Sequence, residues 1–301
     1  MERSLSAKTG AAGRGGWSIG WRMAASLLLA GFSPPGEASA APAAEHPPTR
    51  VVSINLCTDQ LAMLMAAPGQ LYSVSFLARE KGTSMLIDQA AGYVANHGQA
   101  EEVFLMQPDL VLAGAYTARA SVALLEKLGF RVEIFAPETS FDDVRANLTR
   151  MGALLGRERP AAELVAKLDS GLAELAENKG PPRTAALYYA NSYTSGSGTL
   201  ADAMVTAAGL TNIGDALGFT GMARLPLELL LEADPDFIIE GDNQYQSPVL
   251  AKENFVHPAF AALAKRTIAI PDKYTICGGP FTLEASRLLQ EAARKQNGRG
   301  P

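Results

Sequence analysis

The chain has 301 residues, of which 48% are hydrophobic and 19% are charged, and its formal net charge is −5 at pH 7. This composition is typical of a globular protein with enough chain for two domains, and the acidic balance argues against a nucleic-acid-binding protein. The two cysteines, Cys57 and Cys277, are too few and too far apart to predict a disulfide scaffold or a CxxC metal site.

The first forty residues have the features of a secretory signal peptide. Basic residues precede a short apolar run at 23–32, and an A-x-A cleavage motif follows at 38–40. The apolar run is shorter than the roughly 20 residues that a membrane-spanning helix needs. We therefore expect residues 1–40 to be removed, residues 41–49 to form a flexible leader, and the mature protein to be exported and soluble.

Strand-like and helix-like segments alternate through residues 50–157, which we expect to form a first α/β lobe. Short β-branched or apolar runs predict strands at 50–54, 71–75, 110–113 and 130–135. Helical spacing of apolar residues predicts helices near 58–65 and at 101–106, 121–128 and 140–155. The intervening stretch at 79–99 is polar and contains glycine, which favours a long loop or a broken helix.

One long helix is predicted at 160–178, within a linking segment that spans 158–180. Pro160 suits the first helical position, and leucines at 164, 168, 172 and 175 form one apolar stripe. Gly180 and the prolines after it end the helix. This rod would join the two lobes and would limit how far they close on each other.

The same alternation returns in residues 181–295, the expected second lobe, before a tail at 296–301. Strands are predicted at 184–189, 237–240 and 267–270, and helices at 199–208, 225–231 and 281–293. The segments 101–114 and 227–241 share one arrangement of acid, short apolar helix, Pro-Asp, strand and glycine. We expect two mainly parallel sheets flanked by helices, with a ligand cleft between the lobes at the carboxyl ends of the strands.

The sequence carries no recognisable catalytic or metal-binding motif. It has no P-loop, no dinucleotide fingerprint, no HExxH and no nucleophile elbow, and its three histidines are scattered. We therefore predict no catalytic residue, no metal ligand and no cofactor. Three interpretations of Cys57 and Cys277 stay open: two small buried residues, a disulfide, or two contacts to a ligand. A disulfide across the cleft would restrict hinge motion, which counts against the second interpretation.

The chain resembles the periplasmic binding proteins that deliver cobalamin, ferric siderophores or haem to ABC importers. The resemblance rests on the segments RVVSINLCTDQL (50–61), NHGQAEEVFLMQPDLVLAG (96–114), GTLADAMVTAAGLTNIG (198–214), LPLELLLEADPDFIIEG (225–241) and CGGPFTLEASRLL (277–289), together with the rod helix. It implies a monomeric periplasmic protein that captures a metal chelate and presents it to an inner-membrane permease. It also implies that Glu101 and Glu228 dock onto permease arginines, although Glu102 is adjacent to the first of these.

Ligand contacts are predicted by position, in loops that follow strands. The candidates are Asn55, Cys57, Phe76, Arg79 and Tyr116 in the first lobe, and Tyr193, Phe219, Arg224, Tyr245, Tyr274 and Cys277 in the second. Aromatic rings can cover the face of a macrocycle, and arginines can pair with an anionic chelate. The alternatives are an exported two-domain α/β enzyme, and a soluble sensor or scavenger with the same fold. The sequence leaves the chelate, the permease and the cleavage site open.

Overall fold

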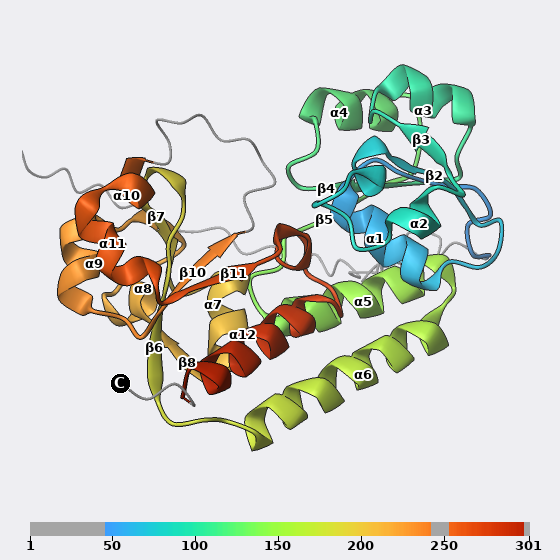
Figure 1. Cartoon of the computed structure of the whole chain (residues 1–301). Coiled ribbons are helices and arrows are strands. Elements are labelled where there is room, and N and C mark those ends of the chain that lie inside the picture. The colour runs from blue at the N-terminus through green and yellow to red at the C-terminus, as the bar shows by residue number, and fades with distance from the viewer. Residues whose placement is uncertain (1–45, 242–252, 298–301) are drawn as a thin grey trace, which may run out of the picture. The chain divides into compact units, whose positions relative to one another are not determined.

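The computed structural model describes residues 46–241 and 253–297 (Figure 1). The predicted signal peptide therefore lies outside the described residues, as does Tyr245. Within the described residues, no helix is both long enough and apolar enough to cross a membrane.

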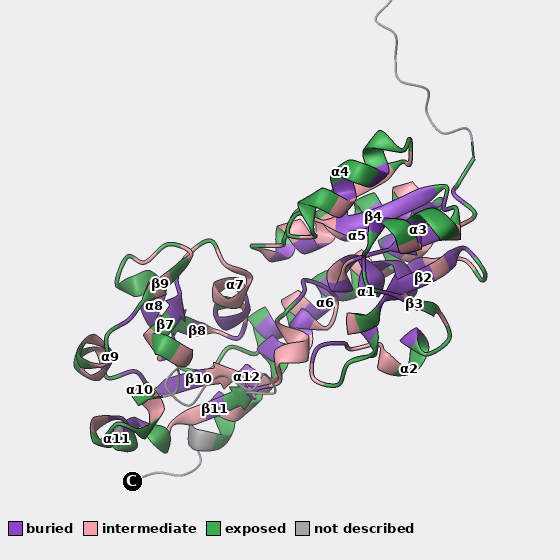
Figure 2. Cartoon of the chain, turned by 90° about the horizontal axis from the view of Figure 1, so that it is seen from above, coloured by how far each residue is buried: buried purple, intermediate pink, exposed green. Residues whose placement is uncertain are grey.

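The first lobe is built on a parallel sheet of five strands in the order β3-β2-β1-β4-β5. Its elements are β1 (Val51–Ser53), α1 (Leu56–Met65), β2 (Leu71–Ser75), the 3-10 turn η1 (Phe76–Arg79), α2 (Ile87–Ala90), β3 (Val94–Asn96), α3 (Ala100–Met106), β4 (Leu110–Gly114), α4 (Arg119–Lys127), β5 (Val132–Phe135) and α5 (Phe141–Leu155). The central strands are buried on both faces, because helices cover each side (Figure 2). Parallel pairing brings the carboxyl ends of all five strands to one edge.

The second lobe has a four-stranded parallel sheet in the order β11-β10-β6-β8 and a separate antiparallel pair, β7-β9. Its strands are β6 (Arg183–Leu187), β7 (Tyr193–Ser195), β8 (Leu210–Asn212), β9 (Met222–Arg224), β10 (Phe237–Gly241) and β11 (Thr267–Ile270). Its helices and 3-10 turns are η2 (Ala190–Ser192), α7 (Leu200–Ala207), α8 (Ile213–Ala216), α9 (Leu227–Ala233), α10 (Glu253–Val256), η4 (Pro258–Phe260), α11 (Ala261–Ala264), η5 (Asp272–Tyr274) and α12 (Thr282–Asn297). The predicted α/β class with parallel sheets is confirmed.

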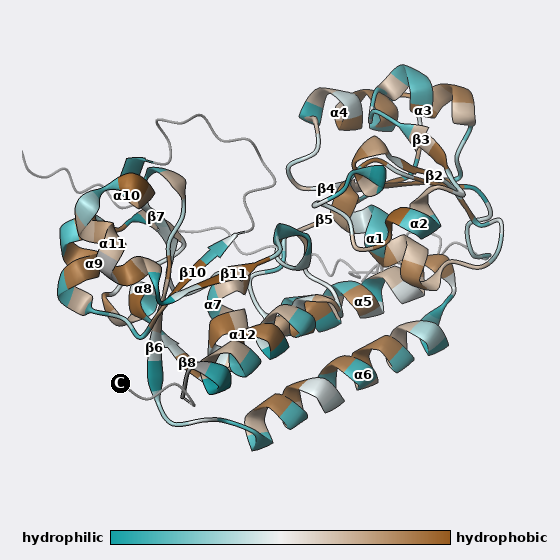
Figure 3. Ribbon diagram, viewed as in Figure 1, coloured by the Kyte–Doolittle hydropathy of each residue, from teal (hydrophilic) through white to brown (hydrophobic). Residues whose placement is uncertain are grey.

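The predicted rod is α6 (Glu158–Glu177), which contacts α5 of the first lobe and both α7 and α12 of the second. Figure 3 shows apolar residues recurring along it at helical spacing. Leu168 and Leu175 are buried, and Leu164 and Leu172 are partly buried against the same core. The helix begins two residues earlier than expected, so placing Pro160 at the first helical position was wrong; Arg157 precedes the helix as its N-cap residue.

The repeated helix–strand unit performs the same task in both lobes. Asp109 accepts hydrogen bonds from the backbone N–H groups of Thr49, at 2.6 Å, and Arg50, at 3.0 Å. Asp236 accepts one from the backbone N–H of Thr184, at 2.8 Å. Each aspartate thus fixes the start of the neighbouring strand, β1 or β6, beside its own strand. The Pro-Asp motif therefore has a structural role that explains its repetition.

Candidate functional site

A pocket lies at the carboxyl ends of β1, β4 and β5 in the first lobe. Its wall is formed by Asn55, Cys57, Thr58, Leu61, Gly114, Ala115, Tyr116, Phe135, Ala136, Pro137 and Glu138. Between β1 and β4 the strand order of the sheet changes direction, and such switch points are where ligands bind in open α/β sheets. The structure therefore brings three of the predicted ligand contacts, Asn55, Cys57 and Tyr116, to one wall.

Larger hollows lie elsewhere, but they are less suited to a ligand. One of them, of about 520 Å³, follows α6 and α12 and is lined by residues such as Lys167, Glu174 and Arg287. It lies along the two helices and away from the strand ends, and two of its charged groups already pair, with Arg287 Nη2 3.0 Å from a Glu174 oxygen. We therefore take the smaller pocket at the strand ends as the candidate site.

The Asn55 side chain sets the geometry of this pocket by capping α1. Its Oδ1 accepts hydrogen bonds from the backbone N–H groups of Cys57, at 3.0 Å, and Thr58, at 3.4 Å. A polar residue that accepts such bonds at the start of a helix satisfies donors that otherwise have no partner. Asn55 is thus engaged by its own helix, and it stays a predicted ligand contact that borders the pocket.

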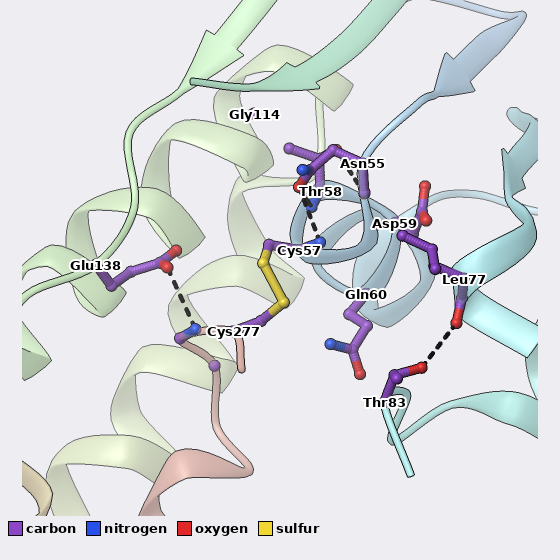
Figure 4. Close-up of a disulfide and its surroundings, with 12 residues drawn as sticks. Asn55, Cys57, Thr58, Asp59, Gln60, Leu77, Thr83, Gly114, Glu138 and Cys277 are labelled. Carbon is purple, nitrogen blue, oxygen red and sulfur yellow. Dashed lines mark hydrogen bonds between the residues drawn. A yellow bond between two sulfur atoms is a disulfide. The ribbon is translucent and has the colours of Figure 1, made fainter. Parts of the chain in front are cut away.

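Cys57 and Cys277 are joined in a disulfide (Figure 4). The bond ties the first turn of α1 to the loop before α12, and Cys277 is buried. Of the three interpretations left open by the sequence, the structure shows the disulfide, and the argument from hinge motion was misleading. Neither sulfur is available as a thiolate ligand, although contact of the disulfide with a bound molecule stays a prediction.

Glu138 makes a second connection beside the disulfide. Its Oε2 accepts a hydrogen bond from the Gly278 N–H at 3.2 Å, and its Oε1 accepts one from Asn147 Nδ2 at 2.7 Å. A Cβ added at Gly278 would lie 2.5 Å from Glu138 Cγ, so only glycine allows this approach. Burial raises the pKa of the Glu138 carboxyl above its usual value, against the lowering effect of the Asn147 amide and the Gly278 N–H.

Glu138 was missed in the sequence, although a signal was present. It follows β5 by three residues, so it satisfies the same positional criterion as the other candidates. Aromatic and basic residues were favoured for a chelate, and an acidic residue was therefore passed over. The place of Glu138 in the pocket wall depends on its hydrogen bonds with Asn147 and Gly278, and these two residues are distant from each other in the sequence.

Phe76 and Arg79 lie in η1, outside the pocket wall. The Phe76 ring stacks on the His97 ring with centroids 5.3 Å apart. Arg79 donates from Nε to the Ala90 carbonyl at 3.3 Å and from Nη2 to the Tyr93 carbonyl. Arg79 thus holds the 79–93 segment together, and its contact with a ligand stays a prediction.

The candidates of the second lobe do not form one cluster. The Arg224 guanidinium lies 5.6 Å from the Tyr193 ring centroid, where β9 pairs with β7. Phe219 packs against one core of this lobe, and Tyr274 packs against another. Their contacts with a ligand also stay predictions, and Tyr245 lies outside the described residues.

The two acids predicted to dock occupy the same position in α3 and α9. Glu101 and Glu228 are both exposed in the first helical turn. Glu102, the alternative to Glu101, accepts a hydrogen bond from the His97 N–H at 2.7 Å and pairs with His97 Nδ1 at 2.9 Å. The pKa of Glu102 is lowered, chiefly by that backbone hydrogen bond. Glu102 is thus paired with His97, and docking through Glu101 stays a prediction.

Comparison with known proteins identifies the family. A family model described as "periplasmic binding protein" matches residues 82–263, which is 182 of the 301 residues. The chain belongs to the periplasmic binding proteins. The family and the solved structures with the same fold are binding proteins rather than enzymes.

This periplasmic binding protein is similar to several characterised members. A curated cobalamin-binding protein of Halobacterium salinarum is 27% identical over 263 residues, covering 83% of this chain and 69% of the relative. The periplasmic haem-binding protein of a Roseiflexus species has a TM-score of 0.66 at 20% identity, covering 81% of this chain and 98% of the other. The vitamin B12-binding protein of Vibrio cholerae has a TM-score of 0.61 at 17% identity, covering 84% and 99%. At these identities the two structural matches establish the fold.

Proposed function

We propose that the protein is the periplasmic solute-binding component of an ABC importer and that it captures a metal chelate for an inner-membrane permease. The observation that carries the proposal is the match to the periplasmic binding protein family over 182 residues. The relatives with known ligands bind cobalamin, vitamin B12 or haem. The pocket at the strand ends of the first lobe has a volume of about 60 Å³, so it would receive only the edge of such a ligand, at the switch point of the sheet. The chelate is thus transported cargo and no resident cofactor is required.

A visible absorption spectrum tests the ligand class. The exported protein would be incubated with aquacobalamin, haem or a ferric hydroxamate, desalted and analysed for bound cobalt and iron. We expect one of the three chromophores to be retained in a one-to-one complex. If none is retained, the chelate proposal fails. The result would then favour a binding protein for a colourless solute, or an exported two-domain enzyme.

Docking through Glu101 and Glu228 is the second part of the proposal. Both carboxylates are exposed at equivalent positions of α3 and α9, so they could meet two equivalent cationic sites on a dimeric permease. We expect Glu101→Arg with Glu228→Arg to abolish uptake and to leave ligand affinity nearly unchanged. Glu126→Arg, an exposed acid on α4, is the matched control. Normal uptake by the double variant would exclude this docking surface and would favour a sensor or scavenger.

A further inference from the structure

The charge of the candidate pocket indicates which chelates it accepts. Among the described residues that form its wall, Glu138 is the acidic one, and no lysine or arginine is present. The arginines expected to pair with an anionic ligand lie elsewhere: Arg79 binds two backbone carbonyls, and Arg224 lies over Tyr193 beside a different hollow that also contains Glu228. The pocket therefore lacks the cations that usually recognise carboxylates.

The Glu138 carboxylate is held rigidly and still has free accepting capacity. Asn147 on α5 and Gly278 in the loop before α12 each donate one hydrogen bond, one to each oxygen. A carboxylate can accept about four hydrogen bonds, and the backbone N–H of Glu138 itself supplies a third, so about one position remains for a group that enters the pocket. Because the side chain is fixed from two directions, it offers this position without losing much conformational entropy on binding.

The carboxyl edge of the second sheet also carries acids. Glu240 lies near the end of β10, where burial raises its pKa, and Asp272 follows β11. Among the described residues, Lys273 is a cationic side chain that follows β11 at this edge of the second sheet. Its Nζ lies 5.3 Å from the Tyr274 ring centroid. The carboxyl edge of the second sheet thus carries more acids than cations, which disfavours a ligand with several carboxylates on that side.

We infer that Glu138 is a specificity-determining residue, which accepts hydrogen bonds from amide groups on the edge of the chelate and excludes chelates whose edge carries carboxylates. This inference rests on the proposed function and narrows it to amide-bearing macrocycles. A carboxylate brought beside Glu138 would face a like charge in a partly buried site, with no cation to compensate. An amide N–H would instead form a charge-assisted hydrogen bond.

Two corrinoids with the same ring test the inference. Dicyanocobinamide carries amides on its edge, and its fully hydrolysed heptacarboxylate carries carboxylates. We expect the wild-type protein to bind the amide form at least about 100-fold more tightly, since several like charges must be desolvated in the other form. Glu138→Gln should reduce this ratio by about 10-fold or more, the size expected for a hydrogen bond to a charged group. Glu138→Asp keeps the charge and should keep the preference.

Controls separate this inference from the proposed function. Glu126→Gln, on the exposed surface of α4, should leave the ratio unchanged, and circular dichroism with a thiol assay would confirm that each variant folds with its disulfide formed.

Equal affinity for the two corrinoids, or a ratio that Glu138→Gln does not alter, would overturn the role of Glu138. Tight binding of haem without any binding of corrinoid would overturn it too, while the chelate function would stand. If corrinoid, haem and ferric hydroxamate all fail to bind, the proposed function and this inference both fall.

Discussion

Asp59 is the most unusual single residue of the first lobe. It is completely buried in α1, where Oδ2 accepts hydrogen bonds from the Ser75 N–H at 3.1 Å and from the Ser75 hydroxyl at 2.5 Å. Its Oδ1 is buried and has no hydrogen-bond partner among the described residues. Burial raises the pKa of Asp59 to about 7, against the lowering effect of hydrogen bonds that include those from Ser75. The folded protein thus favours the protonated form.

We predict that Asp59 makes the protein less stable as the pH rises. The folded-state pKa lies above the unfolded value of 3.8, so the folded state binds more protons between about pH 4 and pH 7. The contribution of Asp59 to the free energy of unfolding therefore falls across this window, by at most about 4 kcal/mol for a shift of this size. Asp59→Asn should flatten this dependence and stabilise the protein at pH 8, as measured by urea unfolding.

Asp88→Asn is the control, because Asp88 is exposed on α2. It should leave the pH dependence unchanged. An Asp59→Asn variant whose stability changes with pH between pH 4 and pH 7 as steeply as that of the wild type would contradict the raised pKa of Asp59.

The sequence was informative about residues whose role depends on local position, and silent about roles that depend on distant partners. Glu101 was named from the family resemblance and its docking role stays a prediction, whereas the contact of Glu102 with His97 could not be derived from the sequence. The pairing of Cys57 with Cys277 could not be derived, because 220 residues separate them. Glu138 was missed because aromatic and basic residues were favoured, and its contact with Gly278 is likewise distant in sequence.

Helices and strands with strong periodicity were predictable to within a few residues. The strand at 71–75 and the strand at 267–270 have the predicted bounds, and Ser140 caps α5 through the Asp143 N–H. Short elements were not predictable. The strand β3 lies inside the segment expected to be a loop or broken helix, and β7-β9 and β8 were not anticipated. These three-residue strands carry too little alternation to be recognised, whereas β1, of the same length, lies in a run of β-branched residues and was predicted at 50–54.

The crossing of α5 and α6 depends on Gly152. A Cβ there would collide with the Cβ of Ala161 and would lie 3.1 Å from the Arg157 carbonyl oxygen, neither of which can rotate away. We predict that Gly152→Ala destabilises the protein by about 1–3 kcal/mol, the usual cost of overpacking, despite the better helix propensity of alanine. Urea unfolding monitored by circular dichroism would measure the change.

Exchanging the residues at positions 152 and 161 tests whether a steric conflict between them causes the loss of stability. The double variant Gly152→Ala with Ala161→Gly restores the space at the crossing, so it should recover most of the lost stability. Gly180→Ala, where nothing lies within 4 Å of the added Cβ, should have little effect. If the double variant is as unstable as the sum of the two single variants, contact between these positions does not explain the effect of Gly152→Ala.

At the scale of the whole molecule, the disulfide closes a loop of 220 residues. In the chain-entropy model, closing a loop of this length stabilises the folded state by about 5 kcal/mol, because the unfolded chain loses freedom. We predict that the double variant Cys57→Ser with Cys277→Ser unfolds at a markedly lower urea concentration than the oxidised wild type.

Reduction gives an independent test of the same bond. Dithiothreitol should lower the wild-type midpoint toward that of the double variant and should not affect the variant itself. An unchanged wild-type midpoint, with both thiols shown to be free by a thiol assay, would mean that the disulfide contributes nothing to stability.

The position of the disulfide also determines how the molecule would respond to mechanical force. A pull applied to the two ends of the chain passes from Cys57 directly to Cys277, which lie 220 positions apart, so the residues between them carry no load while the bond is intact. Both sheets and the helix α6 lie largely within this shielded segment. Reduction under load would release roughly 750 Å of additional chain, at about 3.4 Å per extended residue. An unfoldase or pore that pulls on the oxidised protein therefore cannot draw the segment between Cys57 and Cys277 out as a single strand.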